Sequence, residues 1–163
     1  MSVRIKFANL AAALAVSAVT VAHGGALAGD TAALPETRVV NAGKPFDALV
    51  LRLEQAIKDN NMALVAQASA SRGAAARGVK IPGNIVLMVF RNDYAVRMLE
   101  ASVAAGIEAP LRIYVTEQAD GSTQVSYPLP SAVFRPYGDA RIDAMAQELD
   151  PIFERIVRDA TEK

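Results

Sequence analysis

The chain has 163 residues, with 17 basic and 17 acidic side chains, one histidine, and no cysteine or tryptophan. Its only histidine, His23, lies near the N-terminus, so the rest of the chain lacks the groups needed for a serine–histidine triad, a cysteine nucleophile, a typical zinc site or haem ligation. The balanced charge gives no long-range attraction to nucleic acid.

Residues 1–28 have the pattern of a secretory signal peptide. Arg4 and Lys6 precede an uncharged apolar run over residues 7–22, and Ala26-Leu27-Ala28 places small residues where a signal peptidase cuts. The run is shorter than the roughly 20 residues that a membrane-spanning helix needs. We therefore expect cleavage before Gly29 and a periplasmic or secreted protein that no longer contacts a membrane.

Two alternatives to this cut stay open. In the first, the segment is not cleaved and anchors the protein in a membrane. In the second, cleavage occurs after Ala22 and leaves His23-Gly24-Gly25 as a free N-terminus that chelates copper. With cleavage before Gly29, the loss of Arg4 and Lys6 leaves an excess of about two acidic residues. The remainder is a flexible lead-in over residues 29–36 and a single domain over residues 37–163.

The first elements of this domain are a strand, a helix and a second strand. Thr37–Ala42 favours a strand, and Pro45 suits the first turn of the helix that follows. That helix has an apolar stripe at Phe46, Leu49, Val50, Leu53, Ala56 and Ile57, and it ends at residues 59–61. Met62–Ala70 then indicates a strand of small residues.

The stretch "SASRGAAARGVKIPGN", Ser69–Asn84, combines glycines with basic residues. One interpretation is an anion-binding loop that uses Arg72 and Arg77. The other is a short helical turn capped by Ser71 and ended by Gly78 in the left-handed conformation. The Gly-Lys-Ser/Thr ending of a phosphate loop is missing, so we favour the turn and keep both arginines as candidate ligand-binding residues.

The run Asn84–Phe90 is continuously apolar and predicts a strand buried on both faces. Asn92 stands where an N-cap belongs, and a helix follows to about Val103. Because helix N-termini attract anions, Arg91, Asn92 and Tyr94 are also candidate ligand-binding residues, although a simple cap is the favoured interpretation.

The second half predicts a hairpin and a long helix. Leu111–Gln118 alternates between apolar and polar residues, Asp120-Gly121 marks a turn, and "TQVSYP" returns as a strand. The last helix spans about Asp139–Ala160, with a kink at Pro151. The order β-α-β-β-α-β-β-α favours an α+β fold, a mostly antiparallel sheet with helices packed on one face.

Two further groups have weaker signals. Asp139 and Asp143, one helical turn apart, suit a hard cation, but acids near a helix N-terminus are more simply explained by the helix dipole. Residues 135–138, with Tyr114 and Tyr127, suggest an organic ligand site, but a turn and cross-strand packing are simpler explanations. We therefore expect no metal and no cofactor.

Three segments within roughly residues 39–157 form one pattern: "PFDALVLRLEQAIKDNNMALVAQ", "VKIPGNIVLMVFRND" and "APLRIYVTEQADGSTQVSYPLP". Together they resemble the bacterial family of domain of unknown function 302. Asp93 stands where that family usually has proline. The resemblance implies a sheet-and-helix architecture like that of the TATA-binding protein, without implying DNA binding. It supplies no catalytic residue.

The leading functional hypothesis is an exported, non-enzymatic module that binds an unidentified small molecule or protein partner, with homo-oligomers possible and no nucleic-acid partner. A second hypothesis is an enzyme that uses carboxylate, tyrosine or arginine chemistry, as paired carboxylates do in glycoside hydrolysis. A third is an accessory protein of a redox or metal pathway. A deep pocket with two acids of raised pKa would favour the enzyme, and a shallow apolar surface would favour the interaction module.

Overall fold

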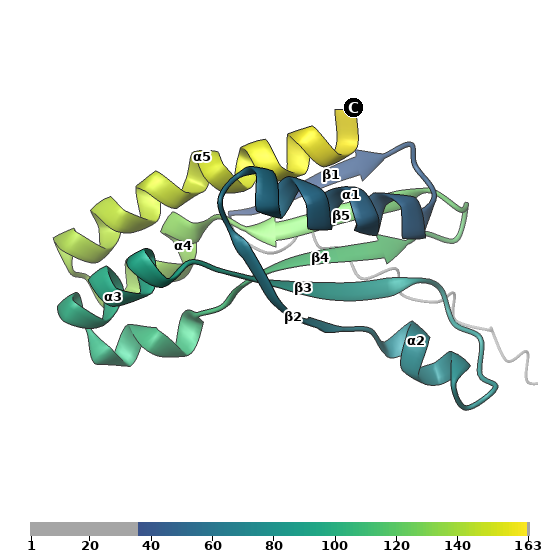
Figure 1. Cartoon of the computed structure of the whole chain (residues 1–163), viewed down its shortest axis with the longest axis horizontal. Coiled ribbons are helices and arrows are strands. Elements are labelled where there is room, and N and C mark those ends of the chain that lie inside the picture. The colour runs from purple at the N-terminus through teal and green to yellow at the C-terminus, as the bar shows by residue number, and fades with distance from the viewer. Residues whose placement is uncertain (1–35, 163) are drawn as a thin grey trace, which may run out of the picture.

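Five strands form one antiparallel sheet in the order β1-β5-β4-β3-β2 in the computed structural model, which describes residues 36–162 (Figure 1). The predicted signal segment and residues 29–35 of the lead-in lie outside the described residues. The strands are β1 Thr37–Ala42, β2 Ala63–Ala68, β3 Asn84–Phe90, β4 Leu111–Glu117 and β5 Thr123–Pro128. The predicted α+β fold is confirmed.

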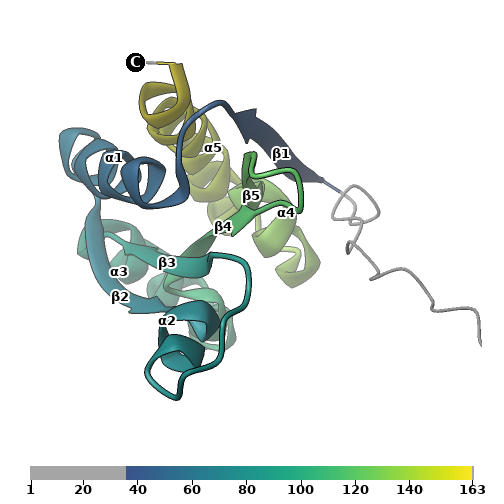
Figure 2. The ribbon, with the colours of Figure 1, turned by 90° about the vertical axis from the view of Figure 1, so that its right-hand side faces the viewer.

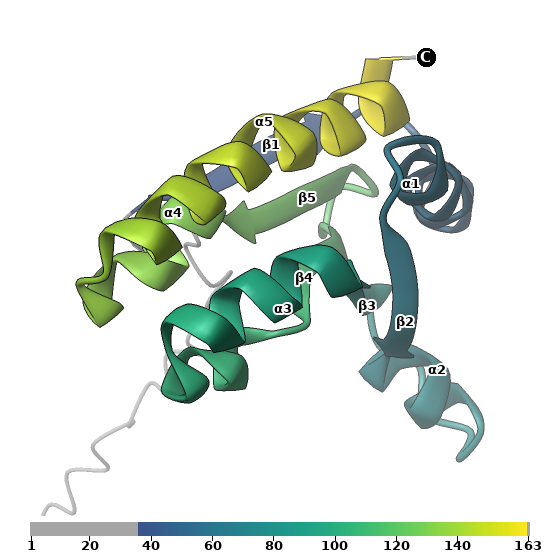
Figure 3. The same cartoon turned by 60° about the vertical axis from the view of Figure 1, so that its left-hand side comes forward.

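The main helices cover one face of this sheet. Figure 2 shows α1 (Phe46–Asp59) and α5 (Ala140–Glu162) on the same side, and Figure 3 shows α3 (Asn92–Ala101) beside α5. Short helical segments complete the connections: α2 Ala70–Ala75, η2 Val103–Glu108, α4 Pro130–Phe134 and η3 Arg135–Tyr137. The helices and strands predicted from the sequence therefore occur in the predicted order. Of the short segments, α2 lies in the Ser69–Asn84 stretch, where a helical turn was favoured, and the other three are additions.

Apolar periodicity explains why α1 and α5 pack where they do. Each helix turns an apolar stripe toward the sheet, and the stripe of α1 is buried from Leu49 to Ile57. In α5 the stripe keeps its phase across Pro151, where Ile152 and Phe153 are both buried. The helix is continuous through the proline, so the segments before and after it form one packing element.

The centre of the core lies between these helices and the inner face of the sheet. Ile85 and Leu87 of β3 and Ile113 and Val115 of β4 are fully buried there. Phe153 of α5 is also buried, and its ring packs against that of Tyr127 on β5 with centroids 5.9 Å apart. Close packing of this kind makes the core sensitive to the loss of even a few carbon atoms.

The other face of the sheet is not covered by any helix of the described residues, and this corrects the prediction that β3 is buried on both sides. Burial alternates along β3, with Ile85, Leu87 and Val89 buried and the residues between them half-exposed. On neighbouring β4, Tyr114 points to the same open face and is 36% exposed. A continuous apolar run therefore does not by itself show that both faces are covered.

The Ser69–Asn84 stretch forms the favoured helical turn, but with a different cap. The Ser69 hydroxyl accepts a hydrogen bond from the Arg72 backbone N–H at 3.1 Å, so Ser69, not Ser71, caps α2. The Ser71 hydroxyl instead accepts from the Asn84 backbone N–H at 3.1 Å and ties the turn to β3. Gly78 has the predicted left-handed conformation, with φ +73°.

Because the phenol of Tyr127 is buried, we expect the folded protein to lose stability at alkaline pH. Burial, with a smaller contribution from nearby Glu154, raises the pKa of Tyr127 from 10.0 to about 12, while Arg38 opposes the shift. Folding therefore favours the protonated phenol. Its contribution to stability is fully present below about pH 10 and is lost as the pH rises through about 12.

We expect the free energy of unfolding, measured by urea denaturation, to fall as the pH rises above about 10. Tyr127→Phe should make this fall shallower, because it removes the titrating group. Tyr137 adds a second contribution to this pH dependence, which Tyr127→Phe leaves in place. Burial and a hydrogen bond from its hydroxyl to Glu108 (3.0 Å) raise the pKa of Tyr137 as well. An unchanged slope in Tyr127→Phe would contradict the assignment.

Candidate binding pocket

An apolar pocket lies where the end of β3 and the start of β4 meet α3, α4 and α5. Its free volume is about 30 Å³, close to that of one small group. The walls are almost entirely apolar, and the side chains come from elements that are distant in sequence: Met62, Val89, Phe90, Arg91, Tyr94, Ala95, Met98, Ala109, Leu111, Phe134, Met145 and Leu149.

Three methionines make the lining of this pocket adaptable. Met62 precedes β2, Met98 is on α3 and Met145 is on α5, and each is nearly fully buried. Methionine side chains are unbranched and polarizable, and they adapt to irregular space more readily than leucine or isoleucine. The wall of the pocket is therefore its most adaptable part, and the free volume increases if these side chains change rotamer.

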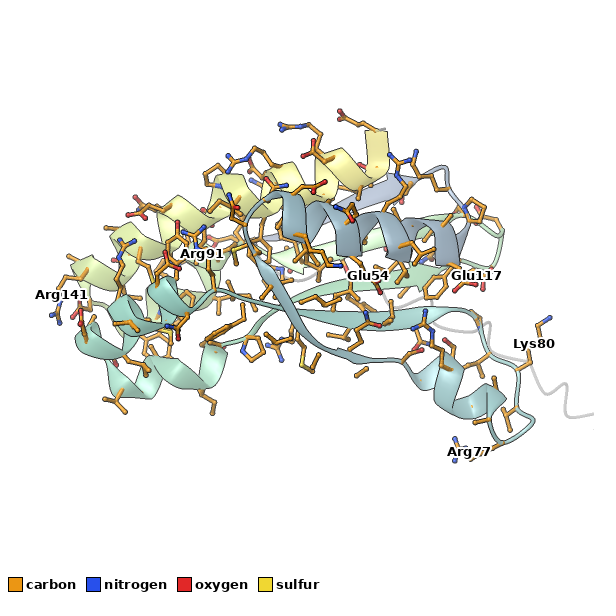
Figure 4. All side chains as sticks on the ribbon, in the orientation of Figure 1. Glu54, Arg77, Lys80, Arg91, Glu117 and Arg141 are labelled. Atoms are coloured by element: carbon orange, nitrogen blue, oxygen red, sulfur yellow. The ribbon has the colours of Figure 1, made fainter. Side chains whose placement is uncertain are left out.

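Arg91 and Tyr94 supply the polar part of the lining. The chain leaves β3 at Phe90 and enters α3 at Asn92, so Arg91 lies at the junction (Figure 4). The Arg91 guanidinium lies 4.1 Å from the ring centroid of Tyr94, within the range of a cation–π contact. It also donates two hydrogen bonds to the Asp93 carboxylate, at 2.8 and 3.0 Å.

A second arginine connects this corner to α5. Arg97 donates to both carboxylate oxygens of Glu148, at 2.7 and 2.8 Å, and its guanidinium lies 5.4 Å from the Tyr94 centroid. Tyr94 is therefore close to two cations, and the Arg97–Glu148 pair joins α3 to α5 on the surface. Exposed pairs contribute little to stability, so the main effect of this pair is to orient the two helices.

The two carboxylates in this network are held in the charged form. The hydrogen bonds from Arg91 lower the pKa of Asp93, and those from Arg97 lower the pKa of Glu148. The same contacts raise the pKa of each arginine. At neutral pH the four side chains are two ion pairs, and neither acid is poised to donate a proton.

Asn92 does not have its predicted role as the N-cap of α3. The Arg91 carbonyl accepts the first helical hydrogen bond, from the Ala95 N–H at 3.2 Å, so Arg91 is the N-cap residue and Asn92 is the first helical residue. No side chain caps this helix. The Asn92 side chain is exposed beside the pocket, while Arg91 and Tyr94 line it.

The other two candidate residues lie elsewhere. Arg72 is on α2 and Arg77 follows it, at the opposite end of the sheet from α3 (Figures 1 and 4). Arg72 donates to Gln67 at 3.5 Å and lies 3.8 Å from Asp47. The five predicted ligand-binding residues therefore do not form one site: two line the pocket, one lies next to it and two are remote.

Two acids, Asp139 just before α5 and Asp150 within it, have separate protein partners. The Asp139 carboxylate accepts hydrogen bonds from the Arg141 side chain and backbone N–H, and these lower its pKa to about 2. Asp150 accepts from the Ser131 backbone N–H at 2.9 Å. Within residues 36–162, no three His, Cys, Asp or Glu side chains are grouped as metal ligands.

The alternative ligand site around residues 135–138 is a turn, as favoured. It is the short helix η3 followed by Gly138 in the left-handed conformation, φ +63°. Tyr114 and Tyr127 lie on opposite faces of the sheet, since Tyr114 pairs with Ser126 across β4 and β5. They do not form the cross-strand pair that the sequence suggested, because they differ by one position in register.

Most of the pocket lining was not predicted from the sequence. Met62, Met98 and Met145 are far apart in the sequence, and each is buried as an ordinary core residue would be. Two local signals point to the pocket: the strand–helix junction at Arg91, and the spacing of Tyr94 and Met98, which are four residues apart on one face of α3.

Comparisons with known proteins agree with this architecture. The family model described as "Domain of unknown function DUF302" matches residues 23–160. The crystal structure of an uncharacterized conserved DUF302 protein from Bacillus stearothermophilus superimposes with a TM-score of 0.70 at 17% identity, over 78% of this chain and 99% of that one. No curated protein matches.

Among helices within residues 36–162, none combines the length and apolar character needed to cross a membrane. The fold of the Bacillus protein is thus shared by this chain, while the low identity carries no functional assignment. Because the family model spans most of the sequence, the chain belongs to the family of domain of unknown function DUF302.

Proposed function

We propose that this protein is an exported, non-enzymatic module that binds a small amphipathic molecule in the pocket beneath Arg91 and Tyr94. The apolar part of the ligand enters between the methionines, and an anionic or hydrogen-bond-accepting head meets Arg91. The observation that carries the proposal is the combination of an almost wholly apolar pocket with an arginine in its lining.

Two physical features support this binding mode. Met62, Met98 and Met145 provide a wall whose side chains adapt to a ligand. Such adaptation is needed because the free volume of about 30 Å³ holds no more than a methyl-sized group. The partner of Arg91 is also easily exchanged: Asp93 is 60% exposed, and releasing an exposed carboxylate to water costs little.

The enzyme hypothesis has less support. An acid catalyst working near neutral pH needs a carboxyl group with a raised pKa. Beside this pocket the pKa values of Asp93 and Glu148 are lowered by their arginine partners. These carboxylates suit charge pairing, and binding is therefore the better explanation of the pocket.

A direct test uses a series of alkyl carboxylates and matching alkyl alcohols, measured by isothermal titration calorimetry. Affinity should rise with chain length until the pocket is full, and each carboxylate should bind more tightly than its alcohol. Ala95→Leu, which fills the pocket, should weaken binding at least about tenfold, since each excluded methylene contributes roughly fourfold.

Ala48→Leu is the matched control, because Ala48 is an exposed helical alanine on α1, away from the pocket. It should leave the affinity unchanged. Equal weakening by the two substitutions, or equal binding of carboxylates and alcohols to the wild-type protein, would contradict the proposed site.

A further inference from the structure

The loop that follows α2 concentrates positive charge that the overall composition conceals. No Asp or Glu occurs between Asp59 and Asp93, while Arg72, Arg77 and Lys80 fall within nine residues. The chain as a whole has equal numbers of acidic and basic residues. The fold places this cationic loop at one end of the molecule, where α2 and the loop extend beyond the sheet (Figure 1).

Backbone hydrogen bonds hold the loop at both ends. At its start, the Val79 N–H donates to the Ala74 carbonyl at 3.0 Å, across the left-handed Gly78. At its end, the Gly83 N–H donates to the Glu117 carboxylate at 2.9 Å, and the Glu117 N–H donates to the Gly83 carbonyl at 2.7 Å. The side chains between these anchors are presented on a defined backbone.

Aliphatic and cationic side chains alternate at the tip. Val79 is 51% exposed and Ile81 is 40% exposed. Figure 4 shows Lys80 extending outward at the end of the molecule and Arg77 on the lower side of the loop, and within residues 36–162 neither forms an ion pair. Exposed aliphatic groups next to unpaired cations match the border between lipid headgroups and acyl chains.

We propose that this loop rests on an anionic lipid surface, with Val79 and Ile81 in the headgroup–acyl boundary and Arg77 and Lys80 against lipid phosphates. The net charge alone predicts no membrane contact, because it averages over the whole molecule, whereas a surface responds to charge within about one Debye length. Three carboxylates at this end of the sheet have partners of their own: Asp47 lies 3.8 Å from Arg72, Glu117 accepts from the Gly83 N–H, and Asp120 accepts from Ser122.

Lipid fits better than the other polyanions. Residues 69–83 contain no aromatic side chain to stack on nucleic-acid bases, and binding to a phosphate backbone leaves Val79 and Ile81 in water. An acidic protein is the remaining alternative, and the experiment separates it. The proposal is independent of the pocket, which lies at the other end of the sheet.

Vesicle flotation tests the charge requirement. The full-length gene is expressed in a bacterial host, the exported protein is purified, and mass spectrometry reads its N-terminus. We expect binding to vesicles rich in phosphatidylglycerol, weaker binding to phosphatidylcholine vesicles, and a decrease as salt rises. Arg77→Gln with Lys80→Gln should weaken binding about twentyfold, since each cation near such a surface contributes roughly fivefold.

Two further variants make the assignment specific. Lys58→Gln with Arg112→Gln removes the same charge from exposed positions outside the loop and should leave binding nearly unchanged. Val79→Ser with Ile81→Ser should weaken binding at least about tenfold, because aliphatic contact with the membrane is lost. Circular dichroism checks that each variant is folded.

A fluorescent label reports insertion directly. The chain has no cysteine, so Val79→Cys carries a single environment-sensitive dye, and Ala48→Cys provides the control position. The dye at position 79 should shift to the blue on phosphatidylglycerol vesicles, and the dye at position 48 should not. Equal flotation of the loop and control charge variants, no loss in the serine variant, or a blue shift only with an acidic polypeptide would overturn the proposal.

Discussion

Replacing Phe153 by alanine is expected to lower the free energy of unfolding by about 3–5 kcal/mol. Phe153 is 1% exposed, lies at the centre of α5 and packs against the ring of Tyr127. The substitution removes buried apolar surface and leaves a cavity that the surrounding sheet and helix fill only in part. This is a large fraction of the total stability of an ordinary domain.

Urea denaturation followed by circular dichroism measures this loss. Leu51→Ala is the control, because Leu51 is a large apolar residue of α1 that is 66% exposed. It should change the free energy of unfolding by no more than about 0.5 kcal/mol. Similar losses in both variants would show that Phe153 is not a main contact of the core.

Tyr94→Ala is expected to affect both stability and binding. Tyr94 is 8% exposed, contacts the guanidinium groups of Arg91 and Arg97, and lines the pocket. Removing its ring should lower the free energy of unfolding by about 3 kcal/mol. Because Arg91 then loses its aromatic support, alkyl carboxylates should bind at least about tenfold more weakly.

Tyr94→Phe separates the ring from the hydroxyl. It keeps the packing and the cation–π contacts and removes only the hydroxyl group, so the expected loss of stability is about 1 kcal/mol. Binding of alkyl carboxylates, measured by calorimetry, should stay within about threefold of wild type. Phenylalanine as damaging as alanine would mean that the hydroxyl, and not the ring, organises this corner.

Local periodicity predicted most elements of the fold. The stripe from Phe46 to Ile57 gave helix α1 with its observed ends, and Thr37–Ala42 formed the expected strand. The alternation of Leu111, Ile113 and Val115 correctly placed the inner face of β4. These patterns succeed because the side chains of one helix or strand face are set by backbone geometry alone.

The helix starts were less predictable. Ser69 and Ser71 are both good N-cap residues, and the hydrogen bond from the Asn84 backbone to Ser71 leaves Ser69 to cap α2. At α3, Asn92 has the side chain preferred for an N-cap, but the first helical hydrogen bond is accepted by the carbonyl of Arg91. Arg91, one residue earlier, is therefore the N-cap residue. Tertiary contacts selected between positions of similar intrinsic preference.

The sequence by itself determined the α+β class, the order of the main elements and the residues that face the core, because these depend on spacing within single elements. Only the tertiary structure decided which face of the sheet stays open. It also decided that Met62, Met98 and Met145 meet around one pocket with Arg91, and that Arg77 and Lys80 extend from the other end. Such contacts depend on how distant elements pack, and no local pattern records that.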